Sequence, residues 1–162
     1  MTLLPFVLLP LFTKLFNNCL ITKTIPDDWK SAVVSPIYKN KGEKSDPNSY
    51  RGISVLSPVA KLFEKVLAKQ ITEYLEKNYL FSENQHGFRK GHSCETALHE
   101  LISYMNVARD KKLTTILLFI DFRKAFDTCD TKLLLLKSFH YGFDNNSIYL
   151  VANYFEKKMP KH

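Results

Sequence analysis

Residues 114–120 read TTILLFI and are followed at once by Asp121. An uninterrupted apolar run of this length is typical of a central strand that is covered on both faces of its sheet. A carboxylate directly after such a strand is poorly placed for stability, because burying an unpaired charge is costly. At the end of a sheet strand it would instead project into the crevice where α/β proteins bind ligands. The stretch therefore predicts a central strand over 114–120 and a candidate site at Asp121.

Two interpretations of Asp121 stay open on spacing alone. A hard divalent cation such as Mg²⁺ would neutralise the carboxylate through oxygen ligands. The alternative is a helix cap or a surface ion pair with Arg123 or Lys124, and spacing alone slightly favours this alternative. Asp127 follows six residues after Asp121, directly behind Phe126, and we interpret it as the cap of the next segment.

A basic hairpin is predicted upstream. Residues 31–38, SAVVSPIY, are rich in β-branched side chains and predict a strand. The loop KNKGEKSDPN follows at 39–48, and residues 50–56 can pair back as a second strand. Strands interleaved with helices indicate an α+β or α/β mixed fold.

Cations crowd this hairpin. Lys39, Lys41 and Lys44 lie in its loop, and Arg51 begins the returning strand. Lysine as a point charge and arginine through its bidentate fork could hold the phosphates of a nucleotide. For Lys41 and Lys44 a solvated loop is the better interpretation, whereas Arg51 in a strand is harder to explain that way.

Two amphipathic helices are predicted on either side of a polar stretch, residues 82–93. The apolar face of the first comprises Val59, Leu62, Phe63, Val66, Leu67 and Ile71, and that of the second Leu98, Leu101, Ile102 and Met105. Between them, the glycines of QHGFRKG (85–91) would let backbone amides approach a ligand. Phe88 offers a stacking face and Arg89 offers a phosphate contact. Taken alone, an ordinary basic turn is the safer interpretation.

The two ends of the chain are predicted to be helical. Residues 3–20 form a helix that Pro10 would break, and the apolar run within it is too short to cross a bilayer, so no membrane segment is expected. Towards the other end, Asp130 or Thr131 would cap a helix that Gly142 terminates, and residues 147–157 form the last helix.

Composition bounds the function classes. The chain has 162 residues, 45% of them hydrophobic, which suffices for one core. Its formal charge of +7 favours a polyanionic partner, most commonly nucleic acid, although a merely basic domain fits equally well. Three widely spaced cysteines indicate reduced thiols rather than a disulfide framework.

Four blocks in order carry a resemblance. The runs WKSAVVSPIYKNKG, NSYRGISVLSPVAKLFEKVL, QHGFRKGHSCETAL and FIDFRKAFD resemble the LINE-type (non-LTR retrotransposon) reverse transcriptases, from about Ile25 to the end of the chain. The resemblance implies an incomplete right-hand polymerase fold. Its parts would be an N-terminal helical segment (1–24), a fingers-like region with the basic hairpin (25–110) and the first part of the palm (111–162).

The resemblance also implies roles for individual residues. Asp121 and the backbone carbonyl of Phe122 would bind Mg²⁺, while Lys39, Arg51 and Phe126 would bind the incoming deoxynucleoside triphosphate. The residues expected to line the template are Gln85, Gly87, Phe88 and Arg89. The implied partners are an RNA template and a DNA primer, and the implied locations are the cytoplasm and the nucleus.

Departures from the family pattern limit the prediction. Gly52 stands where the family usually has proline, which could loosen the hairpin, and Cys94 stands where threonine is common. The family's Asp-Asp hairpin is missing, since Asp27 and Asp28 form the only such pair and lie in the wrong half.

We therefore expect a fragment that does not polymerise by itself. The alternatives are a non-catalytic nucleic-acid-binding remnant and an inactive folding remnant. Within the polymerases, a group II intron-type or retron-type enzyme is the second choice.

Overall fold

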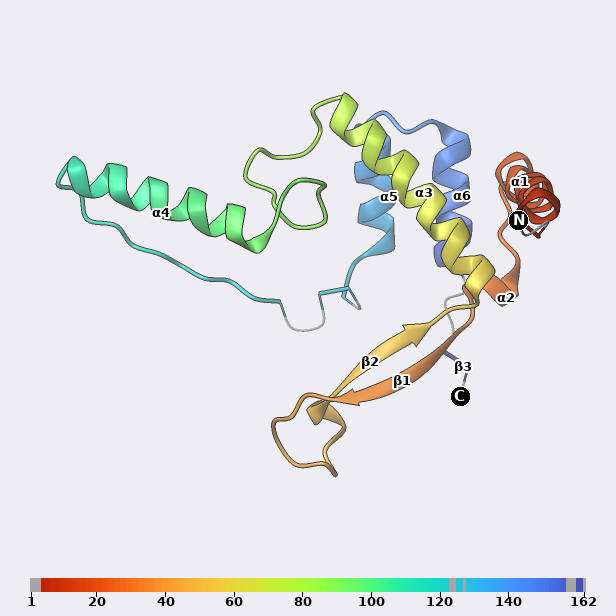
Figure 1. The fold of residues 1–162 in the computed structure, drawn as a ribbon, viewed down its shortest axis with the longest axis horizontal. Helices are drawn as coiled ribbons and strands as arrows, with labels where there is room; N and C mark the ends of the chain where they lie inside the picture. Colours follow the sequence, from red (N-terminus) through yellow and green to blue (C-terminus); the bar gives the residue numbers. More distant parts are fainter. Residues whose placement is uncertain (1–3, 123–124, 127, 157–159, 162) are drawn as a thin grey trace. The chain divides into compact units, whose positions relative to one another are not determined.

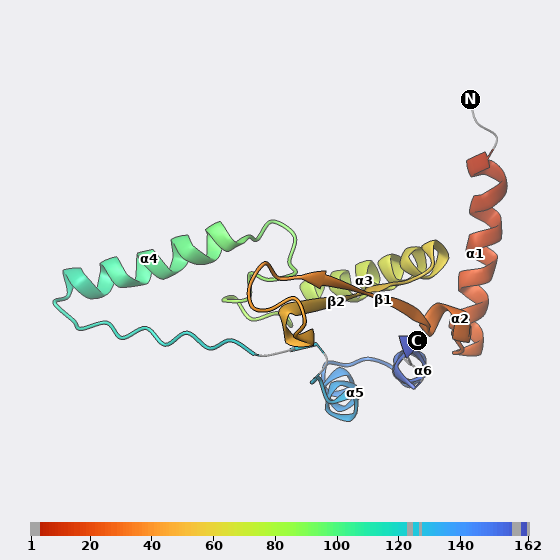
Figure 2. The same ribbon diagram turned by 90° about the horizontal axis from the view of Figure 1, so that it is seen from below.

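The computed structural model describes residues 4–122, 125–126, 128–156 and 160–161. The chain divides into two compact units, each taken by itself below. The first comprises Met1–Leu67 and Asp130–His162, and the second comprises Ala68–Cys129. Helices dominate both, and the described strands form one small sheet in the first unit, so the architecture is mixed helix and strand (Figures 1 and 2).

The predicted hairpin is confirmed. Strand β1 (Ala32–Tyr38) pairs antiparallel with β2 (Tyr50–Val55), in a register that sets Tyr38 opposite Tyr50 and Ile37 opposite Arg51. The short strand β3 (Pro160–Lys161) runs parallel to β1, and the sheet order is β2-β1-β3.

Helix ends in the first unit follow local capping chemistry. In α5 (Thr131–His140) the Asp130 side chain accepts hydrogen bonds from the first turn, which confirms the predicted cap. Helix α6 (Asn145–Phe155) begins two residues before the predicted start, because the Asp144 side chain caps it by accepting from the Ser147 amide.

The N-terminal helix α1 (Leu4–Thr22) is continuous through Pro10. The predicted break is absent because proline removes a single backbone hydrogen bond, and the remaining turns keep theirs. A one-turn helix, α2 (Asp27–Lys30), follows. Among the described residues, no helix has both the length and the apolar character needed to cross a membrane.

An aromatic cluster forms the core of the first unit. Phe63 of helix α3 (Pro58–Lys77) is 2% exposed, and its ring lies 5.1 Å from that of Phe16 and 5.4 Å from that of Trp29. Leu150 of α6 packs against the same cluster. The predicted apolar face of α3 therefore meets α1 and α6. Burial of the Phe63 ring stabilises this packing, because it removes a large aromatic side chain from water.

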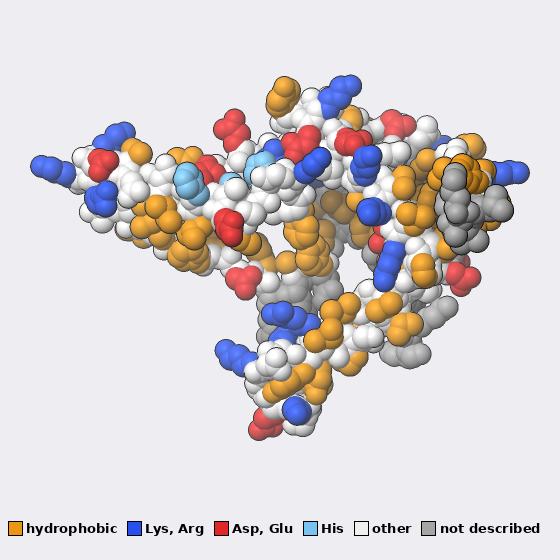
Figure 3. Space-filling view, in the orientation of Figure 1, with side chains coloured by type: hydrophobic (Ala, Val, Ile, Leu, Met, Phe, Trp, Pro, Cys, Tyr) orange, Lys and Arg blue, Asp and Glu red, His pale blue; other side chains and the backbone are white. Residues whose placement is uncertain are grey.

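In the second unit, α3 continues to Lys77 and helix α4 spans Cys94–Asp110. Ser93 and Thr96 make a reciprocal capping box at the start of α4. Both predicted helices are confirmed. The apolar face of α4 is uncovered, however, with Leu98 55% and Ile102 46% exposed. Figure 3 shows apolar side chains gathered over α4 and the chain that returns beside it.

The predicted central strand over 114–120 is wrong. None of residues 113–122 is assigned to a strand, and both Figure 1 and Figure 2 draw them as an extended chain without an arrow. Leu118 is 82% exposed and Phe119 81%. A strand requires neighbours that satisfy its backbone groups, and the described residues of this unit contain no other strand.

Candidate nucleic-acid interface

The hairpin register gathers the predicted phosphate-binding cations. Side chains alternate between the faces of a strand, so Lys39 shares a face with Ile37, and the cross-strand partner of Ile37 is Arg51. The Arg51 side chain is exposed, and Lys39 is exposed as well. Lys39 also donates from Nζ to the carbonyl of Asn48 at 2.8 Å, which orders its side chain along the loop. The first unit thus carries a two-cation face.

The opposite face anchors the loop between the strands. The rings of Tyr38 and Tyr50 lie 5.5 Å apart across the strands. The Tyr50 hydroxyl donates to the Lys44 carbonyl at 2.8 Å, and the Tyr38 hydroxyl donates to the Gly42 carbonyl. Gly42 has φ +85°, and a Cβ there would lie 2.5 Å from the Ser49 hydroxyl oxygen. Glycine is therefore required at position 42. Lys44 takes part in this anchor through its backbone carbonyl.

Gly52 does not interrupt the hairpin. Pro36 is its cross-strand partner. Because the Lys39 amide donates to the Ser49 carbonyl at 2.8 Å, the alternating pattern makes Pro36–Gly52 a pair whose amides point away from each other. Neither position needs an N–H for the ladder, which explains how a strand accommodates Pro36. The expected loosening at Gly52 is therefore not a loss of hydrogen bonds.

The 82–93 loop of the second unit is held to α3 by Arg89. Its Nε and Nη2 donate to the two carboxylate oxygens of Glu76 at 3.0 and 2.9 Å. Its Nη1 donates to the carbonyls of Ser82 and Gln85 at 2.9 and 3.3 Å. The guanidinium also lies over the Phe81 ring, 5.0 Å from its centroid. The Arg89 side chain is 14% exposed, so it faces its own loop rather than solvent.

A second anchor, His86, holds the loop to α4. Its Nε2 lies 2.7 Å from a carboxylate oxygen of Glu100, and its Nδ1 lies 2.8 Å from the Thr96 hydroxyl oxygen. The same hydroxyl also lies 2.9 Å from the Ser93 carbonyl oxygen. Both ring nitrogens therefore contact α4, and together they tie His86 to that helix.

Both anchors perturb the carboxylates they contact. The hydrogen bonds from Arg89 lower the pKa of Glu76 below its usual value. The hydrogen bond from His86, with a second from the Tyr104 hydroxyl at 3.1 Å, lowers the pKa of Glu100. The ionised carboxylates are thus the forms that hold the loop.

The loop presents an aromatic side chain to solvent. Phe88 has φ +60° and is 90% exposed. Its ring lies 6.1 Å from that of Phe126 in an edge-to-face arrangement, and Phe126 is itself 82% exposed. Gln85 and Gly87 are exposed beside it. Two exposed aromatic rings in contact make a surface on which an unstacked base could lie.

Asp121 stands at the end of the extended segment and is exposed, not held in a sheet crevice. Phe122, whose carbonyl is the second predicted ligand, is 73% exposed. The predicted cap at Asp127 lies outside the described residues. Across those residues no group of three or more histidine, cysteine, aspartate or glutamate side chains could hold a metal. Asp121 supplies one oxygen ligand, and the described residues alone do not complete a magnesium site.

The predicted site residues divide between the two units. Lys39 and Arg51 belong to the first. The second contains the predicted metal, sugar and template residues, which are Asp121, Phe122, Phe126, Gln85, Gly87, Phe88 and Arg89. Sequence reasoning missed the partners Glu76, His86 and Glu100. Each flanking helix has a glutamate on its polar side, which could have predicted an ion pair with the basic loop between them. Spacing alone, however, does not identify which glutamate makes the contact.

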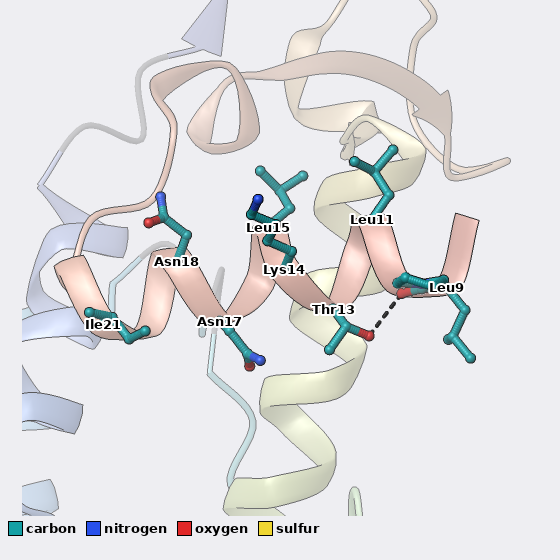
Figure 4. Close-up of a pocket in the computed structure, with 9 residues that line it drawn as sticks. Leu9, Leu11, Thr13, Lys14, Leu15, Asn17, Asn18 and Ile21 are labelled. Carbon is teal, nitrogen blue, oxygen red and sulfur yellow. Dashed lines mark hydrogen bonds between the residues drawn. The ribbon is translucent and has the colours of Figure 1, made fainter. Parts of the chain in front are cut away.

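A surface hollow lies along α1 in the first unit (Figure 4). Its lining comes from that helix alone: Leu9, Pro10, Leu11, Thr13, Lys14, Leu15, Asn17, Asn18 and Ile21. None of the candidate residues lines it, and its chemistry is mostly apolar.

Comparison with known proteins identifies similar chains. Residues 38–161 match the family model described as reverse transcriptase (RNA-dependent DNA polymerase). A "Probable RNA-directed DNA polymerase from transposon X-element" of Drosophila melanogaster is 36% identical over 115 residues, covering 71% of this chain and 13% of the relative. The corresponding protein from transposon BS is 34% identical over 70% of this chain and 12% of its own length. The RNA-directed DNA polymerase from mobile element jockey is 29% identical over 77% and 14%. The matched residues thus span about an eighth of these relatives.

Proposed function

The chain belongs to the reverse transcriptase (RNA-dependent DNA polymerase) family, and from this premise we propose that it forms the fingers and the first palm segment of an RNA-directed DNA polymerase. The similarity to retrotransposon polymerases confirms the LINE-type resemblance. In this proposal residues 25–110 are the fingers region and 111–162 the start of the palm of a right-hand polymerase fold.

The contact between Phe88 and Phe126 carries the proposal. It brings a residue expected at the template and a residue expected under the nucleotide sugar within 6.1 Å of each other, ring centre to ring centre. Both rings are mostly exposed, so both are available to a ligand. A template base stacked near Phe88 and a deoxynucleotide sugar beside Phe126 would make adjoining ligands in such a site.

The basic hairpin is proposed as the triphosphate grip. Lys39 and Arg51 share one hairpin face, and nothing in the first unit buries either side chain. Arginine offers a planar fork to phosphate and lysine a point charge, which together suit a polyphosphate. The net charge of +7 adds long-range attraction for an RNA template and a DNA primer.

Asp121 is proposed as one carboxylate of a divalent-metal site, with the carbonyl of Phe122 beside it. Reverse transcriptases generally use a divalent metal ion. The described residues supply too few ligands to close such a site. We therefore propose that Mg²⁺ binding requires carboxylates beyond those the structure describes, and we expect the isolated chain to bind the ion weakly.

A second candidate function is nucleic-acid binding without catalysis. The absence of a three-ligand metal group among the described residues favours it for this chain taken alone. The test pairs primer extension on an RNA template with equilibrium binding of the same primer–template at several salt concentrations. Binding that weakens steeply with salt, without nucleotide incorporation, is the expected result. Mg²⁺-dependent incorporation by this chain would overturn the expected inactivity, and no binding would overturn both candidate functions.

A further inference from the structure

We propose that Arg89 and His86 are positioning residues, which tie the 82–93 loop to α3 and α4 and so hold Phe88 as an exposed stacking face. The inference rests on the proposed function, because it specifies how the surface for an unstacked template base is built. It assigns Arg89 a role different from the direct template contact expected from the sequence.

Arg89 has little capacity left for a phosphate. A guanidinium carries five N–H donors, and four of them donate to Glu76, Ser82 and Gln85. The bidentate pair with Glu76 uses the edge that would otherwise grip a phosphate. The Phe81 ring covers one face of the group, at 5.0 Å from its centroid. A phosphate could bind only by displacing contacts that order the loop.

His86 makes the corresponding connection on the other side. Both of its ring nitrogens make hydrogen bonds to α4, one with Glu100 and one with Thr96, and its side chain is 15% exposed. The His92 ring lies 5.3 Å from its ring, and Tyr104 donates to the same glutamate. Anchors on both neighbouring helices fix the loop three residues apart in sequence, on either side of Gly87 and Phe88.

Phe88 is the residue that these anchors constrain. A left-handed backbone is unfavourable for a residue with a side chain, so the φ of +60° at Phe88 persists only if the surroundings enforce it. That conformation directs the ring away from the loop, where it is 90% exposed. An exposed phenylalanine ring contributes little to folding, whereas a nucleic-acid base can stack on it favourably.

A substitution at Glu76 distinguishes a phosphate contact by Arg89 from a positioning role. Replacing it in Glu76→Gln raises the net charge by one and removes a carboxylate, which would strengthen binding if Arg89 contacted phosphate directly. If Arg89 positions the loop, the same change weakens binding of a fluorescein-labelled single-stranded oligouridylate by about five- to tenfold, since stacking on Phe88 is lost. The Glu83→Gln variant, at an exposed position of the same loop, is the matched control because it also raises the net charge by one.

A double-variant cycle separates the two roles further. We expect Phe88→Ala to weaken binding, and Arg89→Gln to add nothing in the Phe88→Ala background, because Arg89 acts through Phe88. The dependence of affinity on salt should be the same for Arg89→Gln and the unaltered chain. Additive losses, together with a slope smaller by about 0.7, would show a phosphate contact and overturn the inference.

Amide hydrogen exchange keeps this inference separable from the proposed function. If the unaltered chain binds no oligouridylate, the proposed nucleic-acid function is wrong. The exchange rates still test, by themselves, whether Arg89 and His86 hold the loop. Glu76→Gln and Arg89→Gln should each speed exchange of the His92 amide, which donates to the Arg89 carbonyl at 3.3 Å, while the amides of α4 stay protected. Unchanged exchange at His92 in both variants would overturn the positioning role.

Discussion

The 82–93 loop is polar and held at two points by charged hydrogen bonds, whereas residues 113–122 are apolar and belong to no strand. Both lie in the second unit, and between them they carry most of the predicted site. The loop finds its partners on the helices that directly precede and follow it in sequence. The 113–122 segment has the composition of a central strand but needs neighbours that the described residues do not supply. Residues nearby in sequence order the 82–93 loop, whereas the conformation of residues 113–122 depends on strands from more distant parts of the fold.

The largest expected difference between the two regions is in amide exchange. Amides of 114–120 should exchange at nearly the rate of an unstructured peptide, because no described strand pairs with them. The Gln85 and His92 amides, which donate to the Ser82 and Arg89 carbonyls, should be protected at least about tenfold. Exchange followed by mass spectrometry at neutral pH measures both. Strong protection of 114–120 would show that the segment pairs with other strands. It would contradict the contrast between an ordered loop and an unpaired apolar segment.

Acid should remove the order of the loop and leave the segment as it was. The pKa of Glu76 and that of Glu100 are lowered in the folded chain by the hydrogen bonds from Arg89 and His86. Their contribution is present above the unfolded glutamate pKa of about 4.3 and is lost as the pH falls through the lower folded pKa.

Loop protection, corrected for intrinsic exchange, should therefore drop by severalfold on acidification below about pH 4. The control is the Glu76→Gln variant, in which the Arg89 anchor no longer titrates, so that its protection should change less. Equal acid sensitivity in the variant and the unaltered chain would argue against the Glu76 anchor.

A matched glycine pair tests whether backbone conformation shapes the loop. A Cβ at Gly87 or at Gly91 would meet no atom within 4 Å, but only Gly91 has a positive φ, +78°. Gly91→Ala should lower the free energy of unfolding of the second unit by about 1 kcal/mol, because alanine is strained there. Gly87→Ala should leave it unchanged or raise it slightly by reducing the entropy of the unfolded chain. Denaturant unfolding of both variants gives the answer, and equal losses would refute the role of φ.

The smallest effect on stability is expected in the apolar segment. Leu118 is 82% exposed, so Leu118→Lys should change the free energy of unfolding by less than about 0.5 kcal/mol. The same change should raise the soluble fraction, since it places a charge in an unpaired apolar stretch. Leu118→Ala is the control that removes apolar area without adding charge. A loss of several kcal/mol in Leu118→Lys would mean that the side chain is buried in solution.

Sequence reasoning worked where the determinants are local. The Asp130 cap before a helix and the β-branched runs on either side of the Lys39 loop each depend on neighbours within a few residues. The strand prediction at 114–120 failed. An apolar run indicates that its side chains need burial, but it does not show whether partner strands are present to bury them. Sequence reasoning also did not identify the partner of Arg89, because Glu76 is on the preceding helix, thirteen residues earlier.

The sequence by itself determined the family, the hairpin and the two amphipathic helices, because the periodicity of apolar side chains and the order of four motifs are written along the chain. Only the tertiary structure decided which charged and aromatic groups meet. It gave Arg89 to Glu76 and His86 to Glu100, and it set Phe88 beside Phe126. The physical reason is that hydrogen bonds and ring contacts act over a few ångströms, and the folded backbone selects which of many distant residues come within that range.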